Sequence, residues 1–574
     1  MQRIEPGSKA CICAVNASFT HTSLALFCLE AACADLDVTT KEYSINDAVE
    51  RVCGELYLLD CDVYLFGCYI WNLQFLESVV SRLKAVKPHC VIAFGGPEVS
   101  YDTEAFMLAH PYVDLCLCGE GDESVPSLLR GEDFSKIEGL CYHENGIVLK
   151  PPACVSDLDK LPRVYHAEKL TKMQHKMLYY ETSRGCPFRC SYCLSSTSHG
   201  VRYFDLGRVK ADFKLFMDKK VPLVKLTDRT FNIHPQRTTE LLSYIIDNNK
   251  QTCFHFEVSA DILTEEMLAI LEAAPKGYFQ LEIGVQTTNP QTSAAIDRNA
   301  DFEKIKANVS RLKRAGNMHL HLDLIAGLPY EDYNSFKSSF NDVFSLRPDM
   351  LQLGFLKLLK GTKIREQAMV FDYVATKEPP YEVMQTPWLP YDKMLALKEI
   401  EHVLDTYYNS GAYTSALDYS IAKSGMDAFC YFEKLAEFWK NHTMAGQLLG
   451  QSRLAALLYN FHTTCITADD GLFNALLRYE VLKNNKTAHL GEWAKQPPAT
   501  KAFYDAAWQQ VRKSGCLTEK QLAMKQKDML QYVRIVRFDY DVFSGEKRDT
   551  IILFDYENKN TYSLAVEKNE ENNL

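Results

Sequence analysis

The stretch "ETSRGCPFRCSYC" (residues 181–193) contains three cysteines, Cys186, Cys190 and Cys193, at spacings of four and three residues. Their neighbours are polar or turn-forming, whereas many of the 19 cysteines of the chain lie inside apolar runs, where cysteine acts as a small buried hydrophobe. A zinc site would normally need a fourth ligand in a nearby pair, and no second CxxC or HxxxH follows. An iron–sulfur cluster held by three thiolates leaves one iron open for a small molecule. The spacing therefore favours a cluster over a zinc site or three structural thiols.

The cysteine loop directly follows the first of six predicted strands, which alternate with helices. We predict strands at 177–182, 222–226, 253–258, 279–284, 319–325 and 351–357, and helices at 207–218, 236–248, 264–273, 302–315 and 334–345. This alternation predicts an open, partial (β/α)6 barrel, whose chemistry would lie at the carboxyl ends of its strands. The three cysteines occupy such a position.

A separate alternation of apolar strands and helices precedes the barrel. Strands are predicted at 10–16, 63–69, 90–96 and 113–120, and helical periodicity covers 21–34 and 73–86. Such a segment forms a doubly wound parallel sheet, which binds ligands at the carboxyl ends of its strands. The candidate ligand loops read "NASFTH", "CYIWN", "GGPE" and "GEGDE". Gly95 and Gly96 would let a large planar ligand approach the backbone closely.

The rest of the chain is predicted to form a linker and a third domain. The domain boundaries we expect are 1–142 for the Rossmann-like sheet, 143–176 for the linker, 177–368 for the barrel and 369–574 for the C-terminal domain. That last domain is predicted to be mainly α-helical, with a β-hairpin around Ser544 and Gly545 and a disordered tail from residue 566. The fold class is therefore α/β, with a helical C-terminal region.

Composition and charge restrict the expected partners. The formal net charge is −11 and the chain has no long basic run, which argues against a nucleic-acid surface. The most apolar region, residues 56–71, is interrupted by Asp60 and Asp62, so we expect no membrane span. The first residues lack the layout of a signal peptide, and thiols in this number suit a reducing environment. We therefore expect a cytoplasmic protein of an anaerobic cell.

The segment "GCPFRCSYC" resembles the CxxxCxΦC loop of the radical S-adenosylmethionine (radical SAM) enzymes, with Tyr192 at the aromatic position. This resemblance implies that Cys186, Cys190 and Cys193 bind a 4Fe–4S cluster whose fourth iron binds SAM. It also implies reductive cleavage of SAM to a 5′-deoxyadenosyl radical, with electrons from a reductant such as flavodoxin or ferredoxin. The chemistry would belong to the cofactors, and the protein would position them.

Four further segments resemble the same family in the same order, over about residues 177–365: "VKLTDRTFN" (224–232), "LEIGVQT" (281–287), "LDLIAGLPYED" (322–332) and "LGFLKLLKGT" (353–362). The resemblance implies that four side chains lie near SAM or the substrate. These are Asp228, Glu282, Gln286 and Arg298.

The sheet before the barrel resembles that of the cobalamin-binding subgroup, which includes the magnesium-protoporphyrin oxidative cyclase and many C-methyltransferases. The matching motifs are "GGPEVSYD" (95–102) and "GEGDESVPSLL" (119–129). The residues that this resemblance assigns to cobalamin binding are Tyr69, Ile70, Trp71, Asn72, Gly95, Gly96, Pro97, Glu98, Gly119, Glu120 and Gly121.

The loop after the first strand departs from the subgroup's DxHxxG pattern. His21 is present, but Phe19 replaces the aspartate and Leu24 replaces the glycine. The missing carboxylate would orient the imidazole and raise its basicity. We therefore expect cobalamin to bind base-off without a protein nitrogen below cobalt, and Tyr69 or Trp71 to cover that face.

The function implied by the resemblance is methylation of an unactivated carbon through methylcobalamin. Cyclisation, rearrangement or oxidation without methyl transfer remains an alternative, as do a tRNA methylthiotransferase and a cobalamin-binding sensor. The substrate, a small molecule or a peptide, is not specified by the sequence, because function depends on sites and not on folds. Candidates for its pocket in the C-terminal domain are Tyr407, Tyr408, Tyr413 and Tyr419.

Overall fold

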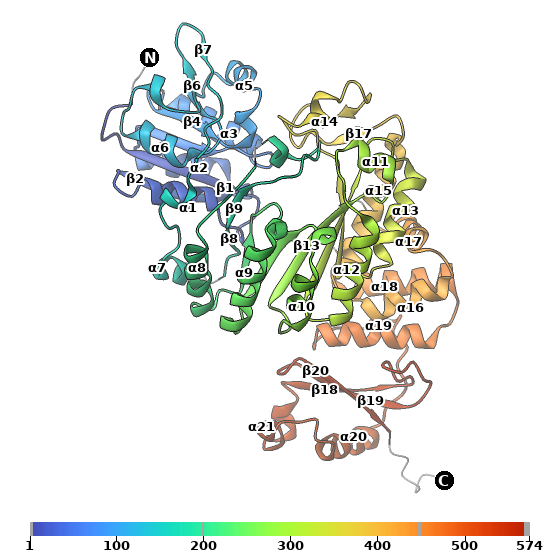
Figure 1. Cartoon of the computed structure of the whole chain (residues 1–574). Coiled ribbons are helices and arrows are strands. Elements are labelled where there is room, and N and C mark those ends of the chain that lie inside the picture. The colour runs from blue at the N-terminus through green and yellow to red at the C-terminus, as the bar shows by residue number, and fades with distance from the viewer. Residues whose placement is uncertain (1–3, 174, 198–199, 445–448, 567–574) are drawn as a thin grey trace, which may run out of the picture. The chain divides into compact units, whose positions relative to one another are not determined.

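The computed structural model describes residues 4–173, 175–197, 200–444 and 449–566. The chain divides into two compact units, Met1–Met394 and Leu395–Leu574, whose elements are labelled in Figure 1. Helix α15 (Tyr391–Leu404) contains the boundary between them. The predicted disordered tail lies almost entirely outside the described residues.

The first unit begins with a seven-stranded sheet in the order β2–β1–β3–β4–β5–β6–β7 (Figure 1). Strands β1 to β5 are parallel and β6 and β7 are antiparallel. The order 2-1-3-4-5 is that of a doubly wound sheet whose switch point lies between β1 and β3, which confirms the predicted architecture. The bounds are β1 Ala10–Asn16, β2 Val38–Ser44, β3 Val63–Gly67, β4 Val91–Gly95, β5 Leu115–Leu117, β6 Leu140–His143 and β7 Ile147–Val148.

Helices cover both faces of this sheet. Helices α2 (Val49–Leu59) and α3 (Leu73–Val86) pack together on one face, where alternate strand residues such as Cys11 and Phe94 form a buried core. Helices α1 (Leu24–Ala32) and α6 (Gly121–Leu129) pack together on the other face. Because neighbouring strand residues point to opposite faces, Ile12 and Ala93 face this second pair. The strands are therefore buried on both sides.

The barrel is a six-stranded parallel sheet in the order β15–β14–β13–β12–β11–β8. It does not close, which confirms the predicted open barrel. Its strands are β8 Leu178–Tyr180, β11 Leu223–Leu226, β12 Cys253–Val258, β13 Phe279–Gln286, β14 His319–Ala326 and β15 Met350–Phe355. Its helices are α8 Leu206–Asp218, α9 Pro235–Asn248, α10 Glu265–Ala273, α11 Pro290–Ala295, α12 Phe302–Ala315 and α13 Tyr333–Phe344.

The second unit consists of helices followed by a small antiparallel sheet (Figure 1). The helices are α16 Thr414–Ser424, α17 Ala428–His442, α18 Gln451–Phe461, α19 Gly471–Asn484, α20 Lys501–Lys513, α21 Glu519–Leu522 and α22 Gln526–Met529. The predicted hairpin is present as β18 (Val533–Phe538) and β19 (Thr550–Asp555), and β20 (Asn560–Ala565) adds a third strand.

The tyrosines proposed for a substrate pocket are largely used in packing. Tyr407 and Tyr413 are buried, and their hydroxyls donate to the carbonyls of Leu454 and Gln451. Tyr419 donates to Asp470. These bonds hold helices of the second unit together, so the three side chains are explained by the fold.

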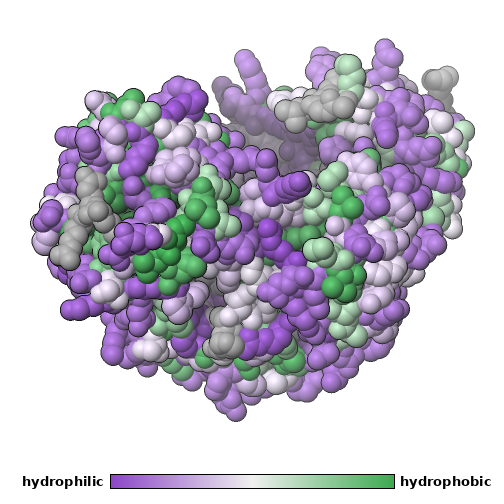
Figure 2. Space-filling view, turned by 90° about the horizontal axis from the view of Figure 1, so that it is seen from above, coloured by the Kyte–Doolittle hydropathy of each residue, from purple (hydrophilic) through white to green (hydrophobic). Residues whose placement is uncertain are grey.

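Among the described residues, no helix is long and apolar enough to cross a membrane. Figure 2 shows one face of the molecule, on which hydrophilic residues predominate and hydrophobic residues gather in a few small patches.

Candidate functional site

The cysteine loop is held between two distant segments of the barrel. The ribbon of β9 (Ser183–Gly185) and β10 (Val201–Tyr203) precedes and follows it. The amide of Ser191 donates to the carbonyl of Ile296 at 2.9 Å, and the amide of Ile364 donates to the carbonyl of Ser191 at 3.0 Å. Cys186 and Cys190 are each only 7% exposed. The loop is therefore fixed by its backbone, and Cys186 and Cys190 are mostly excluded from water, whereas residues 187–189 are exposed.

Polar groups surround the three sulfurs. The Nη1 of Arg298 lies 3.7 Å from the Sγ of Cys190 and 3.5 Å from the hydroxyl of Tyr192. The Sγ of Cys186 lies 3.7 Å from the Oγ1 of Thr230. Among the described residues, the three cysteines do not form a group whose sulfurs all lie within 4.8 Å of one another, a wider spread than one zinc ion with Zn–S bonds of about 2.3 Å allows. A multi-iron cluster fits this spacing.

Asp228 anchors the segment that leads into the loop. Its carboxylate accepts hydrogen bonds from the amide of Thr182 at 2.8 Å and from the hydroxyls of Thr182 and Ser183 at 2.6 Å each. Burial raises the pKa of Asp228, and these bonds oppose that rise. Because both oxygens are used within the protein, the geometry indicates support of the loop and not direct contact with SAM or substrate.

We expect Asp228→Asn to lower the free energy of unfolding by about 2–3 kcal/mol, because its amide group would face the N–H of Thr182 as a second donor. Thermal unfolding of the two proteins measures the difference. Asp218→Asn, at a carboxylate that is 61% exposed, is the control. Equal stability of wild type and Asp228→Asn would refute the anchoring role.

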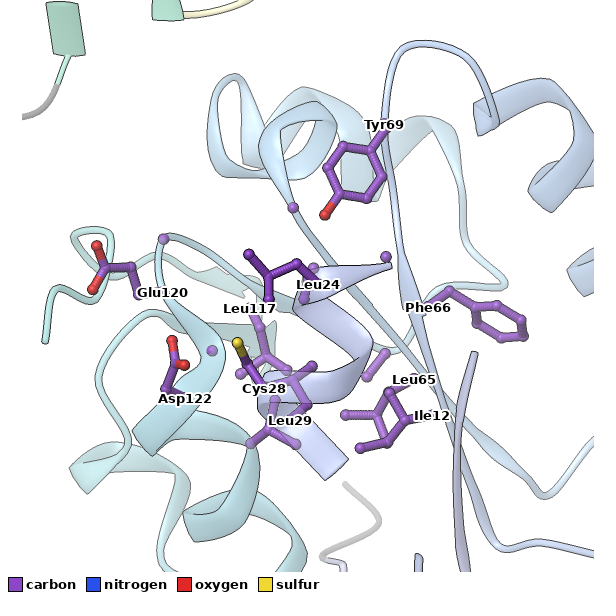
Figure 3. Close-up of a pocket in the computed structure, with 18 of the residues that line it drawn as sticks. Ile12, Leu24, Cys28, Leu29, Leu65, Phe66, Tyr69, Leu117, Glu120 and Asp122 are labelled. Carbon is purple, nitrogen blue, oxygen red and sulfur yellow. The ribbon is translucent and has the colours of Figure 1, made fainter. Parts of the chain in front are cut away.

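An apolar cavity of about 280 Å³, which we call the apolar slot, lies between the first sheet and helices α1 and α6 (Figure 3). Ile12 and Leu65 come from the strands, whereas Leu24, Cys28 and Leu29 come from α1. Figure 3 shows Tyr69 with its hydroxyl directed toward the slot, Glu120 and Asp122 at its rim, and Phe66 pointing away. Its apolar walls and its position at a topological switch point fit a planar aromatic group on a large ligand.

Glycine is needed at the rim of the slot for different structural reasons at different positions. Gly96 has a φ of +102°, and a Cβ there would lie 2.6 Å from the carbonyl of Cys68. Gly119 has a φ of +87°, and its Cβ would lie 2.3 Å from the carbonyl of Ala153. Gly95 has an ordinary conformation, and its Cβ would meet Leu117 at 3.6 Å. Close backbone packing therefore explains Gly96 and Gly119, while the slot itself explains only Gly95.

Several predicted cobalamin contacts lie away from the slot. The side chain of Asn72 accepts from the amide of Tyr69 and donates to the carbonyls of Val15 and Gly67, so it shapes the loop. Glu98 accepts from the hydroxyl of Tyr381 at 2.7 Å. Ile70, Pro97 and Glu98 are not among the residues that line the slot, whereas Tyr69, Gly95, Gly96, Gly119, Glu120 and Gly121 are.

A second cavity, of about 470 Å³, is lined by both the first sheet and the barrel. Tyr69 and Trp71, stacked at 4.5 Å, line it from the sheet. The Nδ1 of His21 lies 3.3 Å from the hydroxyl of Tyr179. The barrel also contributes Lys225, Thr227, Arg229 and Glu257. We call this the shared cavity. Leu24, Ala25 and Tyr69 line it and the slot alike, so the two spaces adjoin.

The inner face of the barrel carries charged side chains on neighbouring strands. Glu282 accepts from Lys225 at 3.0 Å and pairs with His255 at 2.9 Å. Burial disfavours its charge, but His255 and Lys225 outweigh this and lower the pKa of Glu282 to about 2. His321 and Asp323 lie 2.9 Å apart next to Glu282. Lys225 already supplies positive charge to this cluster. The cluster is therefore better suited to hydrogen bonding than to binding a metal ion.

Arg298 contacts the cysteine loop, and Gln286 lies next to Gly284, to whose carbonyl Arg298 donates. Gln286 has a φ of +72°, and its side-chain carbonyl is buried without a hydrogen-bond partner in the structure. Arg298 contacts Cys190, as described above, and also donates to the carbonyl of Gly284. The sequence analysis assigned no role to Arg184, Lys225 and Arg229, although they lie within the quoted segments, or to Glu257, which lies outside them.

Three family models match the chain. Residues 10–129 match the B12 binding domain, residues 180–343 match the radical SAM superfamily, and residues 369–554 match a family described as "Protein of unknown function (DUF4080)". A radical SAM domain implies a 4Fe–4S cluster, SAM, an electron donor and a substrate, and a B12 binding domain implies cobalamin.

Two curated relatives are similar over more than half of the chain. A 2-(S-pantetheinyl)-carbapenam-3-carboxylate methyltransferase from Streptantibioticus cattleyicolor is 24% identical over 402 residues, 65% of this chain and 57% of that protein. The cobalamin-dependent radical SAM methyltransferase TokK from Streptomyces tokunonensis is 23% identical over 377 residues, 61% of this chain and 54% of that protein. The chain thus spans little more than half the length of these relatives.

The fold matches that of the cobalamin-dependent S-adenosylmethionine radical enzyme OxsB with aqua-cobalamin bound. The TM-score is 0.57 at 12% identity, over 88% of this chain and 84% of that one. The chain therefore contains a B12 binding domain followed by a radical SAM domain.

Proposed function

We propose that this protein is a cobalamin-dependent radical SAM enzyme that methylates an unactivated carbon. The observation that carries this proposal is the cavity lined by both the first sheet and the barrel, with the apolar slot on one side and barrel side chains on the other. An enzyme that uses two cofactors on one substrate needs such a shared space.

Each part of the site has a role in this proposal. When bound, the cluster and SAM supply a carbon-centred radical, and cobalamin supplies the methyl group. Cys186, Cys190 and Cys193 hold the cluster, and Arg298 donates to a cluster thiolate. The apolar slot would hold the benzimidazole tail of cobalamin, and the loops at Tyr69, Gly95 and Gly119 would help to hold the rest of the molecule.

The stacked rings of Tyr69 and Trp71 would help to hold cobalamin and exclude water from it. His21 instead orients Tyr179, because its Nδ1 is within hydrogen-bond reach of that hydroxyl. This proposed role of His21 agrees with the sequence of its loop, which departs from the DxHxxG pattern. Gln286 and Glu257 offer a carbonyl and a carboxylate to SAM or substrate.

The partners follow from the same chemistry. We propose that flavodoxin or ferredoxin supplies the electron and that the substrate is a small molecule or a peptide. A reducing cytoplasm is the proposed location, because buried cysteines such as Cys11, Cys13 and Cys116 are free thiols, as expected where thiols stay reduced.

Glu257 gives the site a pH dependence. Burial raises its pKa to about 7, and the charged groups that act on it are Arg229, Glu282, Lys225 and Asp323. Only the ionised carboxylate attracts a cationic group of SAM, so SAM affinity should rise about tenfold between pH 6 and pH 8. In Glu257→Gln this rise in SAM affinity should be absent, and only the pH dependence caused by the titration of SAM itself should remain. Equilibrium dialysis with SAM measures both slopes, and equal slopes would contradict the role.

The proposed function is tested with SAM labelled in its methyl group. Anaerobic protein carrying the reconstituted cluster and cobalamin is incubated with a strong reductant. We expect the label in the cobalamin fraction and 5′-deoxyadenosine in solution. Formation of 5′-deoxyadenosine without label on cobalamin would favour a radical reaction without methyl transfer, such as cyclisation. Absence of both would reject the proposal.

A further inference from the structure

A buried group of charges joins the cysteine loop to the start of α6. The guanidinium of Arg184, two residues before Cys186, forms a two-bond fork with Asp122 at 2.9 and 3.2 Å. Its Nε lies 3.1 Å from both carboxylate oxygens of Glu181, and its Nη1 lies 3.2 Å from Glu120. We call these four residues the arginine bridge. Glu120 and Asp122 lie at the start of α6, next to the first sheet, and Glu181 lies just before the cysteine loop.

The bridge is mostly removed from water. The side chains of Arg184 and Asp122 are 14% and 9% exposed, and those of Glu181 and Glu120 are 16% and 23% exposed. Ion pairs on an open surface fix little geometry, whereas a shielded bidentate pair between guanidinium and carboxylate fixes direction as well as distance. A lysine ammonium would keep the charge but could not form this fork.

The same residues line the apolar slot. Glu120, Asp122, Glu181 and Arg184 all border it, together with the glycine loops. Asp122 lies in the first turn of α6, where the helix end favours negative charge. Only Gly185 stands between Arg184 and the first cysteine of the loop. A displacement of α6 when the slot is filled would therefore reach the cysteine loop through Arg184. Arg202 of β10 also binds Glu120 and provides a second link, to the strand that follows the loop.

We propose that Arg184 is a positioning residue that couples cobalamin in the slot to the geometry of the cysteine loop. This inference rests on the proposed cofactors. Coupling between two binding sites is reciprocal. The cluster should therefore tighten cobalamin binding, and cobalamin should stabilise the bound cluster by the same factor. We expect a factor of about 10, within the usual range of about 5–150 for coupled sites.

The test uses Arg184→Lys, which keeps the charge and removes the fork. Arg311→Lys is the matched control, because Arg311 forms a similar fork with Glu272, at 2.6 and 2.8 Å, between α12 and α10. Equilibrium dialysis gives the dissociation constant of hydroxocobalamin for full-length protein with and without the reconstituted cluster. The ratio of the two constants is the coupling factor. The electron paramagnetic resonance spectrum of the reduced cluster, with and without cobalamin, is a second readout.

Wild type and Arg311→Lys should show a factor of about 10 and a cluster spectrum that changes with cobalamin. Arg184→Lys should show a factor near one and a cluster spectrum that does not change with cobalamin. An undiminished factor in Arg184→Lys, a factor near one in wild type, or an equal loss in Arg311→Lys would each overturn the inference.

If Arg184→Lys fails to assemble the cluster, Asp122→Asn replaces it in the same measurement. This variant keeps Arg184 and weakens its fork on α6, so a reduced factor supports the inference and a full factor overturns it. Wild-type protein that binds no cobalamin would refute the proposed function itself. Binding of both cofactors without coupling would refute this inference alone.

Discussion

Cys190→Ala should leave the protein unable to hold its cluster and should lower 5′-deoxyadenosine formation from SAM at least about a thousandfold. Two remaining thiolates cannot bind the cube that three would hold. The backbone of the next residue, Ser191, is bonded to Ile296 and Ile364, so the loop cannot shift another cysteine into place. Iron and sulfide analysis after anaerobic reconstitution, with quantification of 5′-deoxyadenosine by mass spectrometry, measures both effects.

Two cysteines outside the loop serve as controls for this result. Cys154 and Cys465 are exposed, so their alanine variants should keep full iron content and full 5′-deoxyadenosine formation. If Cys190→Ala retained its iron and its activity, the cluster would have to lie elsewhere in the chain.

Gly95→Val should weaken cobalamin binding about 10- to 100-fold while leaving the cluster and 5′-deoxyadenosine formation intact. Gly95 lines the slot, and a Cβ there would make only an ordinary contact with Leu117 at 3.6 Å. The fold therefore accepts the side chain, whose methyl groups occupy space needed by the ligand. Overpacking costs about 1–3 kcal/mol, and about 1.4 kcal/mol is a factor of ten in affinity. Equilibrium dialysis with hydroxocobalamin measures the change.

Gly96→Ala is a comparison variant that distinguishes the effect of a blocked slot from the effect of a strained backbone. Its φ of +102° and the approach of its Cβ to Cys68 at 2.6 Å should destabilise the sheet itself. Thermal unfolding without cofactors should therefore change for Gly96→Ala and stay near wild type for Gly95→Val. Wild-type cobalamin affinity in Gly95→Val would place the cofactor outside the slot.

The layout of both sheets followed from the sequence because strands of the first sheet are mostly buried and apolar, whereas strands of the barrel alternate buried and partly exposed residues. The segments "ACICAVN" and "FQLEIGVQ" are bounded by turn residues and separated by helical stretches, so both periodicities were clear. Strand β2, "VTTKEYS", is mostly polar and half-buried at an edge, and nothing in it resembles a buried strand. The hairpin of β6 and β7 depends on pairing with β5, which a local pattern does not contain.

The cysteine loop was predictable because its three ligands lie within eight residues of sequence. The arginine bridge was not, because Arg184 meets Glu120 and Asp122 across more than 60 residues. Glu257 was missed for a similar reason: its pKa depends on burial, which appears only when the strands assemble. Asp228 was located correctly in a loop, but the three bonds that occupy its carboxylate depend on residues 182 and 183.

The apolar slot also bears on how long this protein survives in a cell. Leu24, Leu65 and Leu117 border about 280 Å³ of space that the chain itself does not fill, and cavity-lining atoms lack the contacts that a packed interior provides. A ligand that binds only the native state, at 100 times its dissociation constant, stabilises it by about 2.7 kcal/mol. Differences of about 1–2 kcal/mol change protein abundance several-fold through proteolysis. If the slot holds cobalamin as proposed, vitamin supply would set the turnover of the polypeptide as well as its activity.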